Sequence, residues 1–215
     1  HFVDKDETKI KWDEALFKYA QKGKELQFEP KTIVDAIYRP YFKQHLYFNK
    51  ELNWSRYLMP SFFPKGHDNI AICVNGSAGQ KEFSVSISSI GAGQCFPLYW
   101  YEENKNPQAT LFDDAETDKY IRRDGITDWI LKEVRSRFGG SKAITKEHIF
   151  YYVYGLLHSR QYRERFVDDL KKSLPRIPIV DNVQDFMSFY KAGKELADLH
   201  LNYEQNINEQ AVRQD

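Results

Sequence analysis

Glycine-rich turns are the segments of this 215-residue chain whose composition first suggests a catalytic or cofactor-binding loop. A phosphate-binding loop requires the spacing GxxxxGK[ST], and residues 76–81, GSAGQK, do not have it. Residues 91–93, GAG, lack the third glycine of a dinucleotide-binding turn. Residues 106–109, NPQA, lack the second proline and the aromatic residue of a loop that stacks a flipped base. We therefore expect ordinary loops and turns at all three places.

Histidine and cysteine, which often serve acid–base, nucleophilic and metal chemistry, show no pattern of that kind. The six histidines are scattered along the chain, and none neighbours a plausible nucleophile. The only two cysteines, Cys73 and Cys95, belong to no CxxC or Cys/His pair, and this spacing excludes a structural zinc site. We expect both to be reduced thiols of a cytosolic protein and not a disulfide. No catalytic residue, metal site or cofactor is therefore predicted in this chain.

The composition is that of a folded domain. Hydrophobic residues make up 41% of the chain and aromatic residues 15%, enough for a sizeable core. No uncharged apolar run approaches the roughly 20 residues that cross a bilayer, so no transmembrane helix is predicted. The chain starts at His1 without a charged-then-apolar signal segment. We interpret it as a piece of a longer cytoplasmic protein.

Charge is distributed unevenly, although 31 basic and 31 acidic residues cancel. Residues 1–101 carry 13 basic and 11 acidic side chains (+2), and residues 102–118 carry one and six (−5). Residues 119–176 carry 14 and seven (+7), and residues 177–215 carry three and seven (−4). A polyanion responds to the field within roughly 8–10 Å, so the +7 stretch is a candidate binding surface. The alternative is that these cations form solvated helix faces with intramolecular ion pairs.

The first half of the chain reads as helices followed by strands. The patterns predict helices over 9–22, ended by Gly23, and over 32–37, ended by Pro40. Alternation and turn residues predict strands or hairpins over 41–48, 69–74, 82–90 and 94–101. Asn75-Gly76 predicts a turn, Pro97 an edge strand or bulge, and the acidic residues 102–118 a surface loop.

The second half reads as mostly helical. Apolar periodicity and capping residues predict helices over 126–138, over 146–158 after Thr145, from Ser159 onward, and from Asn182 to about residue 203. Pro175 and Pro178 bracket an extended segment, and the polar tail after residue 205 should fray. We predict an α+β fold in which a mixed or antiparallel sheet in the middle of the chain packs against N- and C-terminal helices. The chain forms one domain, 1–215, with a strand-rich part over 1–118, a helical part over 119–205 and the frayed tail 206–215.

Four blocks of sequence carry a more specific signal. They are YRPYFKQHLYFN at 38–49, QCFPLYWY at 94–101, ITKEHIFYYVYGLLHSRQYRERFVDDLKKSLPRIP at 144–178 and AGKELADLHLNYE at 192–204. In this order they resemble the C-terminal region of type ISP restriction-modification enzymes. The resemblance covers roughly residues 31–204, which is most of the chain.

This resemblance implies a role and a set of neighbours. Such bacterial enzymes are single polypeptides with a nuclease, an ATP-driven helicase-like motor, a coupler, an adenine-N6 methyltransferase and a C-terminal target recognition domain. The chain would be that last domain, which reads double-stranded DNA sequence-specifically, has no catalysis or cofactor of its own and works in the cytoplasm. The alternative is an interaction module that holds the upstream methyltransferase and motor together.

A recognition domain needs cations for phosphates and polar side chains for base edges. The resemblance therefore implies a first group of DNA contacts, in which cations alternate with aromatic residues: Arg39, Lys43, His45, Lys50, Arg56 and Lys65. A second group belongs to the basic stretch: Arg160, Arg163, Arg165, Lys171, Lys172 and Arg176. A third group is a polar loop that could enter a groove: Asn75, Gln80 and Lys81.

Each group also has a structural alternative. Arg39 precedes a proline in an aromatic turn and could pin that turn to a carboxylate. The second group could be a solvated helix face, and the polar loop could be a plain hairpin tip. Tyr151, Tyr152 and Tyr154 are expected in the core and not as stacking platforms for bases.

Overall fold

The structure of the chain is a computed structural model that describes residues 6, 14–39, 42–53, 56–74, 85–87, 90–91, 94–105 and 119–205. Its first half contains α1 (Glu14–Gln21), the 3-10 turn η1 (Pro30–Thr32), β1 (Ile33–Arg39), β2 (Phe42–Tyr47), α2 (Met59–Phe62), β3 (Ala71–Val74), β4 (Val85–Ile87), β5 (Ile90–Gly91), β6 (Gln94–Pro97) and β7 (Tyr99–Glu103). Its second half contains β8 (Tyr120–Asp124), α3 (Asp128–Arg137), α4 (Lys146–His158), α5 (Arg160–Arg165), α6 (Val167–Leu170) and α7 (Val183–Leu201).

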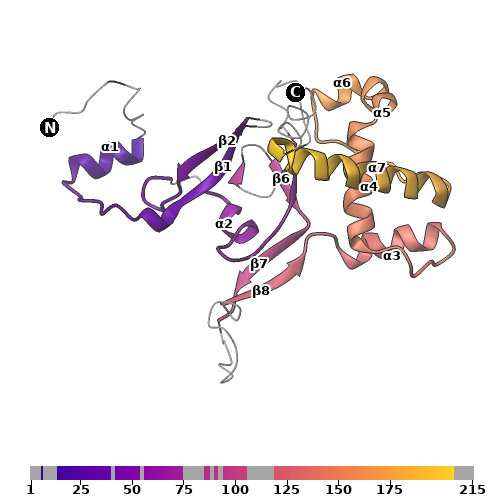
Figure 1. The fold of residues 1–215 in the computed structure, drawn as a ribbon, viewed down its shortest axis with the longest axis horizontal. Coiled ribbons are helices and arrows are strands. Elements are labelled where there is room, and N and C mark those ends of the chain that lie inside the picture. Colours follow the sequence, from indigo (N-terminus) through magenta and orange to yellow (C-terminus); the bar gives the residue numbers. More distant parts are fainter. Residues whose placement is uncertain are drawn as a thin grey trace, which may run out of the picture.

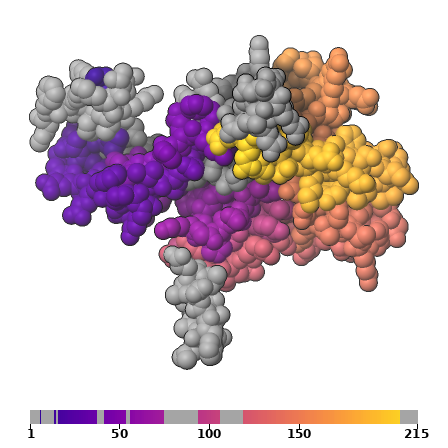
Figure 2. Space-filling view, viewed as in Figure 1, coloured from indigo at the N-terminus to yellow at the C-terminus, as the bar shows by residue number. Residues whose placement is uncertain are grey.

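The elements form the α+β arrangement that the sequence predicts. Short sheets occupy the middle of the molecule, the helices α3 to α7 gather on one side, and α1 with the β1–β2 hairpin extends on the other (Figure 1). In the space-filling view the indigo N-terminal region stands at the opposite end from the orange and yellow helices (Figure 2). Within the described ranges, no helix combines the length and hydropathy needed to cross a membrane.

Three small sheets make up the described strands. The first has the order β2-β1-β5, in which β1 pairs antiparallel with β2 and parallel with β5. The second has the order β4-β3-β6 and is antiparallel throughout, and the third is the antiparallel pair β7-β8. Pro97 lies in β6, at an edge of the described β4-β3-β6 sheet, as expected for a residue without a backbone donor.

The disulfide Cys73–Cys95 contradicts the expectation of two reduced thiols. Cys73 on β3 and Cys95 on β6 are direct partners in the antiparallel register, and their Cα atoms are 4.2 Å apart. This separation is close to the roughly 4.5 Å of a non-hydrogen-bonded cross-strand pair. Spacing along the chain gave no hint of it, because a separation of 22 residues becomes a contact only once the two strands pair.

Several predicted elements of the first half need correction. Residues 32–37 are not helical, because helix-like geometry ends with η1 and residues 33–39 form β1. The β-branched Ile33, Val34 and Ile37 favour a strand, and pairing with β2 and β5 satisfies its backbone. The predicted strand 94–101 is two strands, divided at Leu98, whose N–H donates to Ile70 O at 2.8 Å. The elements α2 and β8 were not predicted.

The other first-half predictions are partly covered by the described residues. The predicted helix 9–22 is seen from Glu14, and Gly23 ends it with a φ of +63°. Strands are present where 41–48, 69–74 and 82–90 predicted them, as β2, β3 and β4. The Asn75-Gly76 turn, the loop 76–81, the turn 106–109 and the tail 206–215 lie outside the described residues. The acidic loop predicted over 102–118 begins later than expected, because Glu102 and Glu103 belong to β7, and its residues 106–118 also lie outside the described residues.

The capping residues of the second half act as the sequence indicates. Thr145 Oγ1 accepts from His148 N while His148 Nδ1 accepts from Thr145 N, which forms a capping box at the start of α4. The side chains of Ser159 and Asn182 accept from Tyr162 N and Asp185 N and begin α5 and α7. Helix α3 is followed by Gly139 and Gly140, which have φ values of +71° and +78°.

The main core lies where α4 crosses α7. Tyr152 and Tyr154 are 1% and 0% exposed, so their predicted place in the core is confirmed, and Tyr151 is half-buried. At the crossing, a Cβ on Gly193 would lie 2.0 Å from Tyr151 O, and a Cβ on Gly155 would lie 2.2 Å from Phe189 O. The two helices therefore touch backbone to backbone, and only glycine fits there.

Candidate nucleic-acid interface

Eleven of the fifteen predicted DNA-contact residues have side chains that the structure describes. Asn75, Gln80 and Lys81 lie outside the described residues, so the predicted base-reading loop stays a prediction. Arg39 is the last residue of β1, and its side chain also lies outside the described part. The eleven described side chains divide between the segment from β2 to just after α2 and the segment from α5 to Arg176.

The loop after β2 is held firmly by asparagines. Asn49 Oδ1 accepts from Glu51 N at 2.7 Å, and Asn53 Nδ2 donates to Tyr47 O at 2.7 Å. These bonds close the chain on itself, as Asn does in turns. They place Lys50 at the exposed tip of the loop.

Two further members of the first group lie close to α2. The Arg56 guanidinium lies 5.4 Å from the centre of the Phe48 ring, a cation–π contact, and Arg56 is half-buried. Lys65 follows α2 and is exposed. Lys50, Arg56 and Lys65 have no acidic side chain within ion-pair distance in the part of the chain that the structure describes.

Lys43 and His45, on β2, have partners within the chain. Lys43 Nζ lies 3.7 Å from Glu204 Oε2 and 5.4 Å from the centre of the Tyr203 ring. His45 Nδ1 lies 3.0 Å from Asp35 Oδ1 on β1, where both side chains are largely exposed. Lys43 therefore joins the N-terminal hairpin to the residues that follow α7.

The second group is divided between exposed cations and one structural arginine. Arg160 pairs with Glu164 at 2.7 Å and Lys171 with Asp168 at 3.1 Å, both on exposed helix faces where such pairs contribute about 0–1 kcal/mol. Arg163 is different, because its Nε donates to Leu157 O at 2.9 Å and its Nη2 lies 3.2 Å from His158 Nδ1. Arg163 therefore fixes the corner between α4 and α5.

The remaining cations of the second group line the end of this helical region. Arg165, Lys172 and Arg176 are exposed, and the Arg165 guanidinium lies 5.6 Å from the centre of the Phe166 ring. Arg176 is held in place through its backbone, because its carbonyl accepts from Tyr162 Oη at 2.7 Å. A cavity of about 410 Å³ opens between Tyr162 and Phe166, and it is lined by Arg176 and also by the acidic Asp169.

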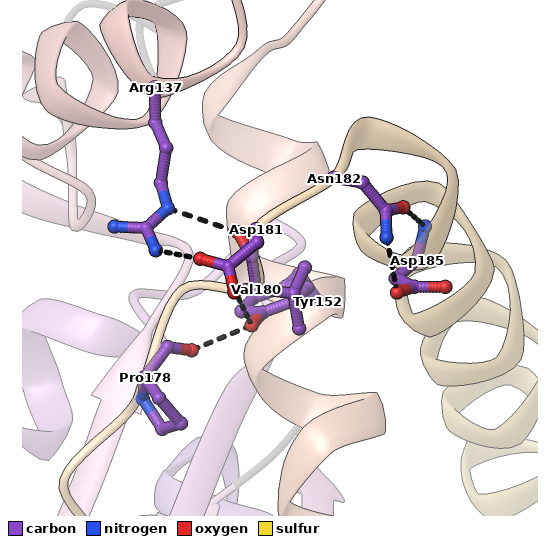
Figure 3. A network of polar contacts seen from close by, with 7 residues as sticks. All are labelled: Arg137, Tyr152, Pro178, Val180, Asp181, Asn182 and Asp185. Atoms are coloured by element: carbon purple, nitrogen blue, oxygen red, sulfur yellow. Dashed lines mark hydrogen bonds and ion pairs between the residues drawn. The ribbon is translucent and has the colours of Figure 1, made fainter.

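Much of the remaining positive charge of residues 119–176 serves the fold. Arg137 donates from Nε to Val180 O at 3.1 Å and from Nη2 to Asp181, and Tyr152 Oη reaches the same segment by donating to Pro178 O at 2.6 Å (Figure 3). Arg135 Nε donates to Ile144 O at 2.9 Å. For these arginines the structural alternative holds, and the net charge of the stretch overstates its binding surface.

Cations on β8 and α4 show the same behaviour. Lys146 contacts both Asp124 and Asp128 at 2.6 Å, and its hydrogen bonds to these two carboxylates raise its pKa above the ordinary lysine value. Arg123 Nε lies 3.0 Å from Glu102 Oε2, which clips β8 to β7. Sequence spacing does not reveal such partners, because they come from strands and helices far apart in the chain.

One exposed feature lies outside the predicted contact set. Tyr57 is 87% exposed and Leu58 is 64% exposed, directly after Arg56. Tyr57 also has a φ of +47°, a left-handed backbone that is rare for a bulky residue. The sequence shows that Tyr57 lies between Arg56 and the residues Leu58-Met59-Pro60, where α2 begins. It does not show the left-handed backbone of Tyr57 or the exposure of its side chain.

These observations define an α+β domain with two groups of exposed cations on a helical and strand framework. The model of the Type ISP C-terminal specificity domain matches residues 1–215, and the chain belongs to that family. The resemblance noted in the sequence is therefore confirmed. A comparison with curated proteins gives no match.

Solved structures of three relatives contain a similar domain. The cryo-EM structure of a DrdV–DNA complex matches with a TM-score of 0.76 and 33% identity, over 91% of this chain and 18% of that chain. The type ISP enzyme LlaBIII bound to DNA matches with a TM-score of 0.71 and 30% identity, over 91% of this chain and 12% of that chain. A nuclease-deletion mutant of LlaGI with a DNA substrate mimic matches with a TM-score of 0.68 and 32% identity, over 94% of this chain and 17% of that chain. The chain thus spans less than a fifth of each of these polypeptides.

Proposed function

We propose that this chain is the target recognition domain of a type ISP restriction-modification enzyme and that it binds double-stranded DNA at a specific sequence. The observation that carries the proposal is the match over 91% of the chain, at 33% identity, to part of DrdV in a complex with DNA. The two further relatives were also solved with DNA or a DNA mimic, which supports the same role.

In this proposal the exposed cations and the half-buried Arg56 bind phosphates and set the register of the domain on the duplex. The phosphate contacts are Lys50, Arg56 and Lys65 in the first group and Arg160, Arg165, Lys171, Lys172 and Arg176 in the second. The ion pairs of Arg160 and Lys171 are exposed and weak, so phosphate can replace their carboxylate partners at little cost. Each contact releases counterions and makes the affinity salt-dependent.

The proposal assigns base reading to the polar loop with Asn75, Gln80 and Lys81, since Asn and Gln suit adenine and Lys suits guanine. In this proposal the domain reads DNA without a cofactor of its own. Cleavage, translocation and adenine methylation belong to the other domains of the same cytoplasmic polypeptide.

Salt titration of DNA binding by the full polypeptide tests this assignment. Changing Arg160, Lys172 and Arg176 to Ala should lower the slope of log affinity against log salt by about 0.9 for each phosphate that the variant no longer neutralises. A matched control changes three other exposed lysines, Lys132, Lys142 and Lys191, which removes the same charge from elsewhere on the surface. Equal slopes for the two triple variants would remove the second group from the interface.

A second candidate function, docking between domains of the enzyme, is favoured by one observation. The region from α1 to β2 exposes large apolar side chains: Phe17, Leu26, Phe28, Ile33 and Phe42. Such side chains suit a protein–protein contact better than a phosphate backbone. If docking is the function, Phe28→Ser with Phe42→Ser should weaken domain association and leave the methylated sequence unchanged.

A further inference from the structure

The turn formed by Arg56, Tyr57 and Leu58 is built as a rigid projection. Met59 N donates to Arg56 O at 3.2 Å, and Ser61 N and Phe62 N donate to Leu58 O at 2.9 and 3.1 Å. The turn therefore runs directly into α2 with its backbone bonded, and the side chains of Tyr57 and Leu58 extend outward, 87% and 64% exposed.

A buried asparagine fixes the base of this projection. Asn69 is 6% exposed, and its side-chain amide donates to Phe62 O at 2.8 Å and to Tyr99 O at 2.6 Å. Its Oδ1 accepts from Tyr99 N at 3.1 Å. The last residue of α2 is thereby tied to β7, so the turn that leads into α2 is anchored to the sheet through its backbone.

Tyr57 combines two features that are both unfavourable for folding. A left-handed backbone is disfavoured for any residue with a Cβ, and more so for a bulky one. Because Tyr57 is 87% exposed, its ring contributes little to the core. Strained residues of this kind concentrate at functional sites, and here the strain aims an aromatic side chain at the solvent.

The charge around the turn indicates the chemistry of its partner. Residues 42–67 carry four Lys or Arg, at 43, 50, 56 and 65, against the single acidic Glu51, a net of +3, and of these four cations Lys43 pairs with Glu204. Glu51 is itself within 3.5 Å of Lys24 Nζ. Trp129, another exposed aromatic, sits instead beside Asp128, which pairs with Lys146. The Tyr57 turn thus offers an aromatic and an aliphatic tip within a cationic segment, which fits nucleic acid.

We propose that Tyr57 and Leu58 contact the bases of duplex DNA directly, the ring of Tyr57 packing against a base face at a step opened by the two side chains. Lys50, Arg56 and Lys65 bind the phosphates on either side. This inference rests on the proposed function. Apolar side chains that wedge between base steps in a cationic setting are an established way to bind and bend a duplex, and base–aromatic stacking tolerates any base.

The decisive variant is Tyr57→Gly in the full polypeptide. Glycine adopts a φ of +47° without strain, so the stability of the domain should stay the same or rise. The dissociation constant for duplex DNA should increase about 5- to 150-fold, the range expected when one base is no longer stacked. The salt slope should not change, because no charge is removed.

Two controls test whether the effect comes from the aromatic ring at position 57 or from the loss of any exposed ring. Tyr57→Phe keeps the ring and should keep the affinity. Trp129→Ala removes another well-exposed ring, which lies outside residues 42–67 and beside the acidic Asp128, and it should have no effect. Wild-type affinity in Tyr57→Gly overturns the inference. Lowered thermal stability of the full polypeptide with unchanged DNA affinity also overturns it, because Tyr57 would then contact another domain.

DNA binding by the domain and base contact by Tyr57 are tested by different variants, so the failure of one claim can be told from the failure of the other. If the domain does not bind DNA, the Arg160, Lys172 and Arg176 substitutions also leave the affinity and the salt slope unchanged. If only the Tyr57 inference is wrong, those substitutions lower the slope while Tyr57→Gly binds like the wild type.

Discussion

The helical part of the domain and its strand-rich part are stabilised in different ways. The largest fully buried side chains all belong to α3, α4 and α7: Tyr152, Tyr154, Phe150, Phe186, Leu157 and Val134. The strand-rich part has a second, small cluster around Ala71 and Cys73, and it exposes many of its apolar side chains. The helical part therefore supplies most of the packed core, and the strand-rich part adds Ile72, Val74 and Leu98 to it.

The use of charge follows the same division. In the helical part, Arg135, Arg137 and Arg163 donate to backbone carbonyls and keep loops and corners in place. In the strand-rich part, Lys50 and Lys65 extend into solvent. The difference teaches that net charge along the sequence does not locate a binding surface, because the more basic stretch uses part of its charge to hold its own fold.

Breaking the helical framework should have the largest effect. Gly193→Ala would place a Cβ 2.0 Å from Tyr151 O and 2.6 Å from Gly155 N, so α7 must move away from α4. We expect the free energy of unfolding to fall by about 3 kcal/mol or more, measured by urea denaturation. Gly66→Ala is the matched control, since it meets no atom within 4 Å and changes only a left-handed turn residue. A decrease no larger than that of the control would show that the crossing is loosely packed.

The strand-rich part should depend on its covalent link. Cys73 and Cys95 are 22 residues apart, and the bridge between them should contribute about 3 kcal/mol by restricting the unfolded chain. Unfolding with and without a thiol reductant measures this contribution, and the double variant Cys73→Ala, Cys95→Ala should not respond to reductant. Because cytosolic thiols are normally kept reduced, a thiol-reactive dye gives a direct check. Two reactive thiols in the native, untreated protein would contradict the bridge.

The stability of the segment between α6 and α7 should depend on the hydroxyl of Tyr152. Tyr152 Oη donates to Pro178 O at 2.6 Å and accepts from Val180 N at 3.2 Å (Figure 3). Tyr152→Phe leaves both backbone groups without this partner and should cost about 1–3 kcal/mol of unfolding free energy. Tyr57→Phe, which changes a side chain that is 87% exposed, should cost far less. If the two variants unfold alike, the network does not hold the segment.

The smallest effect should be a dependence of stability on mildly acidic pH. Burial lowers the pKa of His200 and of His148 below the ordinary value of 6.5, so the folded protein keeps both rings neutral. Below that pH the unfolded chain takes up protons that the folded chain does not, and stability falls as the pH drops toward the lowered pKa values. Above it, the full stability remains.

Replacing both rings with glutamine should flatten this pH dependence. Glutamine at position 148 can still accept from Thr145 N in the capping box, so α4 keeps its start. Unfolding free energies from about pH 7.5 to about pH 5 provide the comparison. An acid slope as steep in the double variant as in the wild type would assign the effect to other groups.

The sequence predicted the helical part well because the signals there are local. Thr145, Ser159 and Asn182 each cap a helix that begins at the next residue, and apolar periodicity identified the buried face of α4. The candidate cations Arg160, Arg163 and Arg165 were placed on a helix, as α5 confirms, whereas Lys171 and Lys172 follow α6. Their partners were not predictable, because the carbonyl that Arg163 binds depends on how α4 and α5 meet.

The strand-rich part was harder because its determinants are distant in the chain. Residues 33–37 were predicted as part of a helical turn, although Ile33, Val34 and Ile37 are β-branched, and it is the pairing with β2 and β5 that makes them β1. The Cys73–Cys95 bridge and the β7–β8 pair also require contacts between separated segments. The left-handed Tyr57 depends on the closing of the turn before α2 and leaves no mark in composition or periodicity.

Exchange of this domain between two type ISP enzymes that modify different sites tests the central claim most directly. The methylated sequence is read from the genome of cells that express each chimera. Our account predicts that the methylated site follows the transplanted domain. A chimera that methylates the site of the recipient enzyme would contradict the account and assign sequence reading to another part of the polypeptide.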